Sequence, residues 1–520
     1  MNKYLYIFIL SILASETEAS AQINGTQNND VPRLVVNISI DQLRSDYMEA
    51  FMPLYGEDGL KRLLAEGRIY TQPTYPFAPV DRASASAALS TGTTPYYNGV
   101  PSAEWLSRKT LRPVRCTAAD GSTTPSPKAL SVTTIGDELK VASHGAAKVY
   151  AIAAEQDAAI MSAGHAADAA FWVNPKDGKW CSSAFYIKTT PPWVDAFNRL
   201  NAPAQKAGST WKAIDGITAN CSYFPSSGVI KPFSHTFAGN KQFLDYTTSA
   251  LINSDITTLA LQCQSSTAMG IDDVTDMLSL QYYAGTFCHQ NTNDVQLELQ
   301  DTYVRLDRAI AQLVTTLEQR VGKDHLLFVI TSTGYYDDVV TDLSQYRIPT
   351  GTFYINRTAG YLNMYLAAIY GQGNYVEAYH GNHIYLNLTT IEQKHIQLSD
   401  ILGRAREMLL MSDGVRDAYT SLGLLSNSNA EADMMRNGYC IGISGDIIVE
   451  VAPGWKVFNE DNQQETKARQ ACVAFPVIFY GAGIQHETVS TPVKMTQIAP
   501  DICKSIRIRA PNACKSAPLH

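Results

Sequence analysis

The 520-residue chain has no uninterrupted apolar stretch of about 18 residues, the length that a membrane-spanning helix requires. A transporter or channel built from such helices is therefore excluded. The chain also lacks a basic excess, because 41 Lys and Arg residues stand against 49 Asp and Glu residues, a net charge of −8. A protein that follows nucleic-acid phosphates normally carries surplus positive charge, so we expect no nucleic-acid partner.

Charged residues make up only 17% of the chain and hydrophobic residues 45%, so the chain can bury a large core and is not disordered. No internal repeat or low-complexity tract is present. A chain of this length allows roughly two to four domains, or one large α/β core with insertions.

The cysteines follow no metal-binding pattern, since there is no Cys-x-x-Cys pair and no Cys/His spacing typical of zinc. Their number, nine, is odd, so at least one thiol stays unpaired even in an oxidising compartment. Cys503 and Cys514 lie closest together in the sequence and are the candidates for a disulfide.

The one marked apolar run lies at the start of the chain. Lys3 precedes it, residues 4–14 form it, and the small residues Ala19-Ser20-Ala21 follow after a polar segment. This order is typical of a secretory signal peptide. We expect cleavage after Ala21 and a mature protein in the periplasm, associated with the outer membrane, or outside the cell.

Strand-like and helix-like segments alternate, which predicts an α/β fold with a largely parallel sheet. Residues 34–40 read as a strand buried on both faces, and further strands are expected at 149–154, 277–280, 326–331 and 473–480. One helix is expected at 48–66, with Gly67 as its C-cap. A second, amphipathic helix is indicated by apolar residues at three- and four-residue spacings: Leu299, Tyr303, Leu306, Ile310, Leu313 and Leu317.

Two stretches interrupt this alternation and are interpreted as insertions that cap the sheet. Residues 190–245 are rich in Pro, Gly, Ser and Asn, and residues 341–455 carry short strands with at least one helix near 402–410. The predicted organisation is a signal peptide (1–21), a core in three parts (22–189, 246–340 and 456–520) and the two caps.

Several motifs occur in an order that resembles the alkaline phosphatase superfamily. Asp41 directly follows the first strand, where ligands of open α/β sheets gather. The further matches are Thr91-Gly92-Thr93-Thr94-Pro95, Gly164-His165-Ala166-Ala167-Asp168, Asp301-Thr302-Tyr303-Val304-Arg305, Val477-Ile478-Phe479-Tyr480-Gly481 and Ile498-Ala499-Pro500. The chain is most similar to the periplasmic branch with a Thr nucleophile, which is related to type I nucleotide pyrophosphatase/phosphodiesterases. This resemblance extends from residue 33 to the end and implies a three-layer sandwich around a mostly parallel sheet.

The resemblance also implies a chemistry, two-metal phosphoryl transfer. Two zinc ions about 4 Å apart activate the nucleophile and clamp the leaving oxygen, held by Asp and His residues at strand ends. Asp41 matches the first of these ligands. Gapless comparison places Arg82 at the nucleophile position, and a guanidinium that stays protonated does not attack phosphorus. Ser84 or Ser86 would serve only if this turn were shifted.

The groups that contact phosphate in the family are replaced as well. Ala103 stands where an Asn is expected, and Glu155 and Asp157 stand where a Lys and an Arg are expected. Two cations have become two carboxylates, which reverses the local field and would repel a phosphate dianion.

The remaining ligand positions carry residues without metal-binding character in this setting, and they are Tyr282, Thr286, Thr333, Gly334 and Ala474. A slipped alignment recovers His289, but not its Asp partner. We therefore expect neither zinc nor another cofactor, and we interpret the chain as a pseudoenzyme.

Three functional hypotheses follow. The leading one is an exported, catalytically inactive relative of alkaline phosphatases that binds an envelope protein or a non-phosphate ligand as a scaffold. The second is a zinc-dependent phosphomonoesterase or phosphodiesterase with relocated ligands. The third is a metal-free hydrolase, or a sugar- or peptide-binding module, that uses Ser84 or Ser86.

Simpler roles are expected for most of these side chains. Asp41 is expected to pair with Arg82, rather than to bind a cation with Asp337 or Asp338. Glu155 and Asp157 are either solvated loop charges or parts of an altered pocket.

Histidines and tyrosines outside the replaced positions also have simple interpretations. His165 is expected to be a hydrogen-bonded core residue. His380 and His383 are spaced like metal ligands but have no carboxylate at ligand spacing. Tyr282-Tyr283 and Tyr335-Tyr336 are expected to form partly exposed cleft walls, because a buried tyrosine needs a partner for its hydroxyl.

Overall fold

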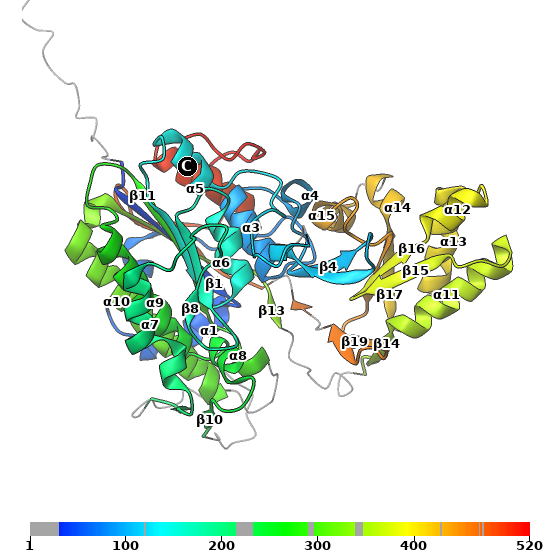
Figure 1. The fold of residues 1–520 in the computed structure, drawn as a ribbon, viewed down its shortest axis with the longest axis horizontal. Coiled ribbons are helices and arrows are strands. Elements are labelled where there is room, and N and C mark those ends of the chain that lie inside the picture. The colour runs from blue at the N-terminus through cyan, green and yellow to red at the C-terminus, as the bar shows by residue number, and fades with distance from the viewer. Residues whose placement is uncertain are drawn as a thin grey trace, which may run out of the picture.

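The computed structural model describes residues 31–118, 121–214, 232–289, 296–337, 347–426, 429–466, 469–470 and 473–519. The expected signal peptide, Asp338, Cys221 and Cys472 lie outside these ranges. The described residues form a large lobe and a smaller lobe, joined side by side (Figure 1). Within the described residues, no helix is both long and apolar enough to cross a membrane.

The large lobe is built on a nine-stranded sheet in the order β23-β2-β22-β12-β1-β11-β6-β7-β8. The strands are β1 (Leu34–Asp41), β2 (Arg68–Tyr70), β6 (Val149–Ala153), β7 (Ala169–Val173), β8 (Trp180–Cys181), β11 (Asp276–Tyr283), β12 (Leu326–Ser332), β22 (Val477–Gly481) and β23 (Glu487–Val489). The central pairings β12-β1-β11-β6-β7 are all parallel, whereas β22 runs antiparallel to both of its neighbours. The prediction of an α/β sandwich with a mostly parallel sheet is confirmed.

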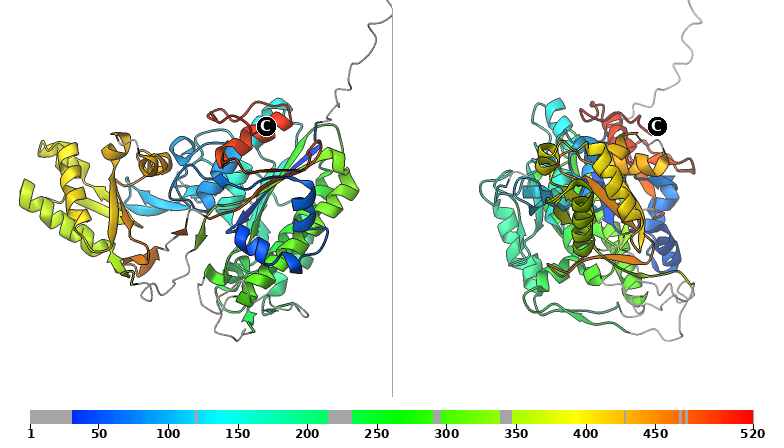
Figure 2. Two further views of the ribbon diagram at one scale, coloured as in Figure 1. Left: turned by 180° about the vertical axis from the view of Figure 1, so that it is seen from behind. Right: turned by 90° about the vertical axis from the view of Figure 1, so that its right-hand side faces the viewer.

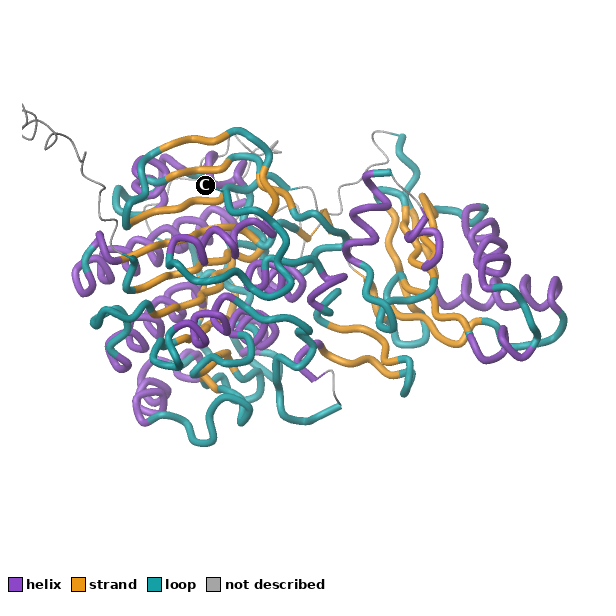
Figure 3. The backbone as a smooth tube through the Cα atoms, turned by 90° about the horizontal axis from the view of Figure 1, so that it is seen from above, coloured by secondary structure: helices purple, strands orange, loops and turns teal. Residues whose placement is uncertain are grey.

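Helices cover both faces of this sheet, as the view from behind and the view from above show (Figures 2 and 3). Residues of β1 alternate between the two cores: Val36 and Ile38 pack on one face and Val35 on the other. The first core includes α2 (Leu60–Glu66), α7 (Pro192–Asn201), α9 (Leu251–Thr267) and α10 (Gln296–Val321). The second includes α3 (Arg82–Thr91), α5 (Ile135–Ala142), α6 (Gln156–Ala163) and α16 (Ile498–Ser505).

The amphipathic helix predicted around Leu299–Leu317 is α10, and all six residues of its apolar stripe are buried. The prediction of one continuous helix at 48–66 is wrong. The chain there forms α1 (Ser45–Ala50), a 3-10 turn (Met52–Leu54) and α2. Pro53 lies within the turn and lacks the backbone N–H that a continuous helix would use at that position. The strand predicted to begin at 473 begins at Val477.

The smaller lobe is formed by the second predicted insertion. Its four-stranded antiparallel sheet has the order β15-β16-β18-β17, with β15 (Val376–His380), β16 (His383–Leu386), β17 (Val415–Thr420) and β18 (Ile447–Val451). The helices are α11 (Ile355–Tyr370), α12 (Leu388–Gln393), α13 (Leu398–Leu410), α14 (Ser421–Ser426) and α15 (Ala430–Gly438). A second sheet joins β14 (Gly351–Tyr354) to β19 (Trp455–Asn459) and β20 (Gln464–Thr466), so the lobe continues past residue 455.

The first predicted insertion, 190–245, packs on the large lobe instead of forming a lobe of its own. It contains α7, the short strands β9 (Thr210–Trp211) and β10 (His235–Thr236), and α8 (Gln242–Thr247). Buried acidic groups of α10 hold it in place: the indole Nε1 of Trp211 donates to Asp301 Oδ2 at 2.7 Å, and His235 Nε2 lies 2.7 Å from Glu298 Oε2.

The remaining elements connect the lobes or cover strand ends. The antiparallel hairpin of β4 (Glu104–Ser107) and β5 (Arg112–Arg115) and the short helix α4 (Pro95–Asn98) lie between the two lobes (Figure 1). Two short pairs complete the fold, β3 (Pro73–Thr74) with β24 (Val493–Lys494) and β13 (Tyr336–Asp337) with β21 (Arg469–Gln470).

Candidate functional site

The parallel strands bring the predicted site residues to one edge of the sheet. Asp41 ends β1, Tyr283 ends β11, Thr333 follows β12, and Glu155 follows β6. Because these strands are neighbours and run in the same direction, their carboxyl ends lie together at the edge where α/β proteins place their ligands.

Asp41 lies at the centre of this edge and is almost fully buried, with 2% of its surface exposed. Its Oδ1 accepts a hydrogen bond of 2.9 Å from the hydroxyl of Thr333. Burial raises the pKa of Asp41 above its ordinary value, and the nearby charges of Arg82 and His289 offset this only in part. The group is thus a carboxylate that the folded protein holds in an unfavourable environment.

Arg82 is the first residue of α3, and it pairs with Asp157 rather than with Asp41. Its Nε and Nη2 donate to the two carboxylate oxygens of Asp157 at 2.9 and 3.0 Å. Its Nη2 also lies 3.9 Å from Glu155 Oε2. The prediction of an Asp41–Arg82 ion pair is wrong, because the guanidinium turns toward α6, where the planar carboxylate of Asp157 accepts both hydrogen bonds.

The ion pair stabilises the ionised forms of both Arg82 and Asp157. Asp157 and Glu155 raise the pKa of the Arg82 guanidinium against the effect of its burial. Burial alone would raise the pKa of Asp157, but Arg82 holds it below its ordinary value. Glu155 is also fixed, because its Oε1 accepts a hydrogen bond of 2.8 Å from Thr247. Neither acidic residue is a freely solvated loop charge.

Little space remains beside this pair. The cavity lined by Asp41, Arg82, Glu155, Thr247 and Gln281 measures about 10 Å³. That is about the room that one water molecule needs. A phosphate ester does not fit there without a rearrangement of these side chains.

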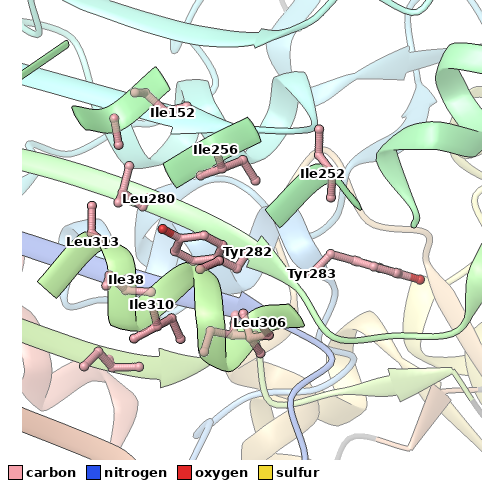
Figure 4. Close-up of a cluster of buried hydrophobic side chains, with 14 of the residues drawn as sticks. Ile38, Ile152, Ile252, Ile256, Leu280, Tyr282, Tyr283, Leu306, Ile310 and Leu313 are labelled. Atoms are coloured by element: carbon pink, nitrogen blue, oxygen red, sulfur yellow. The ribbon is translucent and has the colours of Figure 1, made fainter. Parts of the chain in front are cut away.

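The side chains at the other replaced positions differ in their surroundings, and the hydroxyl of Thr286 is buried without a hydrogen-bond partner. Tyr282 lies among the apolar residues of the sheet and of α9 and α10 (Figure 4), and its hydroxyl is 2.8 Å from Thr257 Oγ1. Thr286 is buried, and Ala474 is exposed. Gly334 has a φ of +73°, and a Cβ on it would lie 2.4 Å from the ring of Tyr75. The Tyr75 ring thus occupies the space that a side chain at 334 would need.

A polar cluster next to Asp41 was only partly anticipated. His289 Nδ1 lies 2.7 Å from Asp337 Oδ2, and Gln42 Nε2 is 3.1 Å from each of these two atoms. Gln42 is fully buried with a φ of +62°, a backbone conformation that side chains other than glycine rarely adopt. Gln42 could have been predicted as a site residue, because it directly follows the strand that ends at Asp41. The contact of His289 with Asp337 could not, because the loop geometry that forms it has no sequence signature.

Ser84 and Ser86 serve the helix on which they lie. Asp81 is the N-cap of α3, and it forms a reciprocal capping box with Ser84, in which Asp81 Oδ1 accepts from the Ser84 backbone at 2.9 Å. Ser86 donates to the carbonyl of Arg82 at 2.8 Å. Both serines are buried. The other carboxylate oxygen of Asp81 accepts from the backbone N–H of Ala103 at 2.7 Å, so the segment that carries Ala103 is fixed to the same cap.

The four tyrosines expected as partly exposed cleft walls are all buried, so that prediction is wrong. The exposed fraction does not exceed 5% for any of Tyr282, Tyr283, Tyr335 and Tyr336. The hydroxyl of Tyr283 donates to the Thr286 carbonyl at 2.6 Å. Tyr282 and Tyr283 thus obtain the hydrogen-bond partners whose absence would have disfavoured burial.

The remaining histidines and cysteines were partly predicted. His165 is hydrogen-bonded, with Nδ1 3.0 Å from Asp137 Oδ2, but it lies at the surface and not in the core. His383 Nδ1 accepts from the Gly445 backbone at 3.0 Å, and burial lowers its pKa to about 4. The bridge proposed for Cys503 and Cys514 is not present, because both are free thiols.

The donor set does not fit the two-zinc centre that the resemblance implies. In the described ranges, no group of three or more His, Cys, Asp and Glu side chains is arranged to hold a metal ion. Oδ1 of Asp41 accepts from Thr333, whereas its Oδ2 is buried and has no hydrogen-bond partner, and the side-chain space at 334 is filled by Tyr75. The guanidinium of Arg82 is fixed by Asp157.

Comparison with known proteins identifies what this architecture is similar to. The sequence profile described as type I phosphodiesterase / nucleotide pyrophosphatase matches residues 35–472. The alkaline phosphatase PafA of Elizabethkingia meningoseptica is 27% identical over 96% of both chains. A protein of Myroides odoratus named calcium-transporting ATPase is also 27% identical over 96% of both chains.

The solved structures agree with the sequence matches. The crystal structure of wild-type PafA superimposes with a TM-score of 0.81 at 26% identity, and covers 94% of this chain and 98% of its own. A PafA variant in which a threonine, an asparagine, a lysine and an arginine are replaced matches with a TM-score of 0.80.

Proposed function

We propose that this chain, which belongs to the type I phosphodiesterase / nucleotide pyrophosphatase family, is a non-catalytic member that acts by binding. The alignment of Arg82 with the nucleophile and the lack, in the described ranges, of a group of three or more His, Cys, Asp and Glu side chains that could hold a metal ion support this proposal. Its place would be the bacterial cell envelope, after export by the N-terminal signal peptide. Its partner would be an envelope protein or a non-phosphate ligand.

The observation that carries this proposal is the ion pair of Arg82 with Asp157. In the PafA variant, the replaced threonine and asparagine are separated by the same number of positions as Arg82 and Ala103. Its replaced lysine and arginine are separated by one residue, as Glu155 and Asp157 are. This correspondence supports the alignment in which Arg82 stands for the threonine and two carboxylates stand for the two cations.

The replacements at these positions change the charge in opposite directions, which argues against an accidental loss of the catalytic residues. A positive group has entered where a neutral one is expected, and negative groups have entered where positive ones are expected. The two changes compensate each other in a bidentate pair at 2.9 and 3.0 Å. The resulting cavity has room for about one water molecule, and Arg82, the one cation among its described lining residues, is already paired and does not await a phosphate group.

Turnover of p-nitrophenyl phosphate and of bis-p-nitrophenyl phosphate tests the proposal. The purified protein is assayed with added zinc, and the Asp41→Ala variant, prepared identically, measures any contaminating phosphatase. We expect equal, background rates for the two proteins. A rate well above background that is lost in Asp41→Ala would overturn the non-catalytic assignment.

One observation favours a second candidate, a zinc-dependent phosphomonoesterase or phosphodiesterase with relocated ligands. His289 and Asp337 lie beside Asp41, and the charge of His289 acts on that carboxylate. A relocated centre would use these three side chains, so His289→Ala would abolish zinc binding together with turnover. Isothermal titration with zinc separates the candidates, since the non-catalytic assignment predicts the same heat for the native protein and for His289→Ala.

A further inference from the structure

The smaller lobe contains a cavity of about 340 Å³. This volume is at the lower end of the range of small-molecule sites, about 300–1,000 Å³. The cavity is formed by α13, by β17, which is an edge strand of its sheet, and by the two helices that follow β17, α14 and α15 (Figure 1). Its size is therefore suited to a small organic molecule.

The base of the cavity is apolar. Ala418, Leu424 and Ala432 line it, and none of them is more than 2% exposed. The ring of Tyr419 belongs to the same lining, but its hydroxyl is already bound, since it donates to Glu450 Oε2 at 3.1 Å. This base offers a hydrocarbon side chain a surface to pack on.

Two side chains of opposite charge, Arg406 and Asp417, stand beside this base, and no other charged residue is found among the described lining residues. Arg406 Nη2 donates to Asp417 Oδ1 at 2.9 Å. Both side chains also bind the peptide groups of Ala418: Arg406 Nε donates to its carbonyl at 2.9 Å, and its N–H donates to Asp417 Oδ1 at 2.7 Å. The two charges are thus held in place before a ligand arrives, which lowers the entropic cost of binding.

One polar atom of each of these side chains remains available to a ligand. Within the described ranges, neither Arg406 Nη1 nor Asp417 Oδ2 has a hydrogen-bond partner. Both side chains reach solvent, with exposed fractions of 47% and 30%. The cavity therefore presents one cationic donor and one anionic acceptor next to an apolar base.

The ligand that fits this pair of charges carries both signs itself. An anion would meet the carboxylate of Asp417, and a cation would meet the guanidinium of Arg406, whereas a zwitterion complements both. The neighbouring charges are already engaged, because Arg416 pairs with both Glu431 and Glu450.

We propose that this cavity binds a free α-amino acid with an apolar side chain. The carboxylate of the ligand accepts from Arg406 Nη1, its ammonium group donates to Asp417 Oδ2, and its side chain packs on Leu424 and Ala432. The site lies apart from the sheet edge that carries Asp41. Binding of an amino acid and turnover of phosphate esters can therefore fail separately.

Isothermal titration of the full mature chain with L-leucine, L-methionine and L-phenylalanine tests the proposal. We expect saturable one-to-one binding of at least one of them, with a Kd below about 1 mM. The N-acetyl derivative of the ligand that binds best lacks the ammonium group, and its amide lacks the carboxylate. Each derivative should bind at least about tenfold more weakly, because it loses one charge-assisted hydrogen bond. Absence of saturable binding for all three amino acids, or undiminished binding of either derivative, would overturn the proposal.

Two variants assign the binding to this cavity. Arg406→Gln and Asp417→Asn each remove one of the two charges and should weaken binding by at least about tenfold. The matched control is Arg404→Gln, which should bind as the native protein does. Arg404 lies on the same helix and is 49% exposed, but it pairs with Glu407 and is absent from the described lining.

Circular dichroism verifies that each variant keeps its fold. Native-like affinity in a folded Arg406→Gln or Asp417→Asn protein would contradict the assignment. If either variant does not fold, the comparison of the amino acid with its two derivatives on the native protein decides the question.

Discussion

Arg82 and Asp157 form a bidentate ion pair in which both side chains are largely removed from solvent, with hydrogen bonds of 2.9 and 3.0 Å. The first begins α3, and the second lies in the first turn of α6. The pair thereby joins two helices at the edge of the sheet that carries Asp41.

Replacing Arg82 by alanine should destabilise the folded protein strongly. Removal of one partner of a buried pair leaves the other charge uncompensated, which typically costs about 3–5 kcal/mol. Urea unfolding of Arg82→Ala against the native protein measures this loss.

Two companion variants make that experiment specific. Arg82→Lys keeps the charge but loses the planar two-point contact, so its loss should be smaller. The double variant Arg82→Ala/Asp157→Ala removes both charges and should recover part of the loss. Equal stability of Arg82→Ala and the native protein would show that the pair is not formed in solution.

Asp41→Asn should increase the free energy of unfolding at neutral pH. The pKa of Asp41 is raised above the ordinary value of 3.8, so its ionised form costs stability at neutral pH, and this cost disappears as the pH falls below 3.8. The asparagine keeps an oxygen to accept the Thr333 hydrogen bond. The gain should therefore shrink progressively when unfolding is measured at decreasing pH.

Asp157→Asn is the matched control, with the opposite sign. The pKa of Asp157 is lowered, so its charge stabilises the folded state above the unfolded-state value and this contribution is lost as the pH falls through the folded-state pKa. Asp157→Asn should thus destabilise at neutral pH. A destabilised Asp41→Asn would contradict the account, since it would mean that the carboxylate of Asp41 is needed in its charged form.

Gly334→Ala should be destabilising by at least about 2 kcal/mol, because the left-handed backbone conformation and the overlap with Tyr75 both oppose a Cβ. Gly403→Ala on α13 is the control: a Cβ at this position would meet no atom within 4 Å, and alanine favours a helix over glycine by about 1 kcal/mol. In thermal unfolding, the melting temperature of Gly334→Ala should be lower than that of the native protein, and that of Gly403→Ala should be higher. An unchanged melting temperature for Gly334→Ala would show that Tyr75 moves away easily.

A fluorophosphonate probe should label neither Ser84 nor Ser86. Both hydroxyls are buried and take part in the hydrogen bonding of α3. Ser84→Ala should instead reduce stability by about 0.5–2 kcal/mol, the usual range for loss of an N-terminal capping interaction. Stoichiometric labelling that is lost in Ser84→Ala or Ser86→Ala would revive the metal-free hydrolase hypothesis.

The fold was largely predictable because its signals are local. The buried strand at Leu34, the stripe of α10 and the alternation of strands with helices each follow from the spacing of apolar residues. The limit of the second insertion was less predictable, because β19 joins the smaller lobe through pairing with β14, about a hundred residues earlier in the chain.

The site was predictable in its residues but not in its contacts. Asp41 was predicted from its position directly after a strand, and Arg82, Glu155 and Asp157 were identified only through the resemblance to the alkaline phosphatase superfamily. Which carboxylate Arg82 selects depends on the direction of its side chain at the start of α3. The contact of His289 with Asp337 depends on a loop in which Cys288 and His289 both have positive φ, a conformation that the sequence does not indicate for either residue.

The zinc content of the purified mature protein, measured together with phosphomonoester and phosphodiester turnover on the same sample, tests the central claim most directly. The account predicts no stoichiometric zinc and no turnover above the Asp41→Ala background, because the described residues hold no metal-binding cluster and the alignment that we propose places Arg82, which is paired with Asp157, at the nucleophile position. Two zinc ions per chain with turnover that depends on Asp41 would contradict it and would establish an active enzyme with relocated ligands.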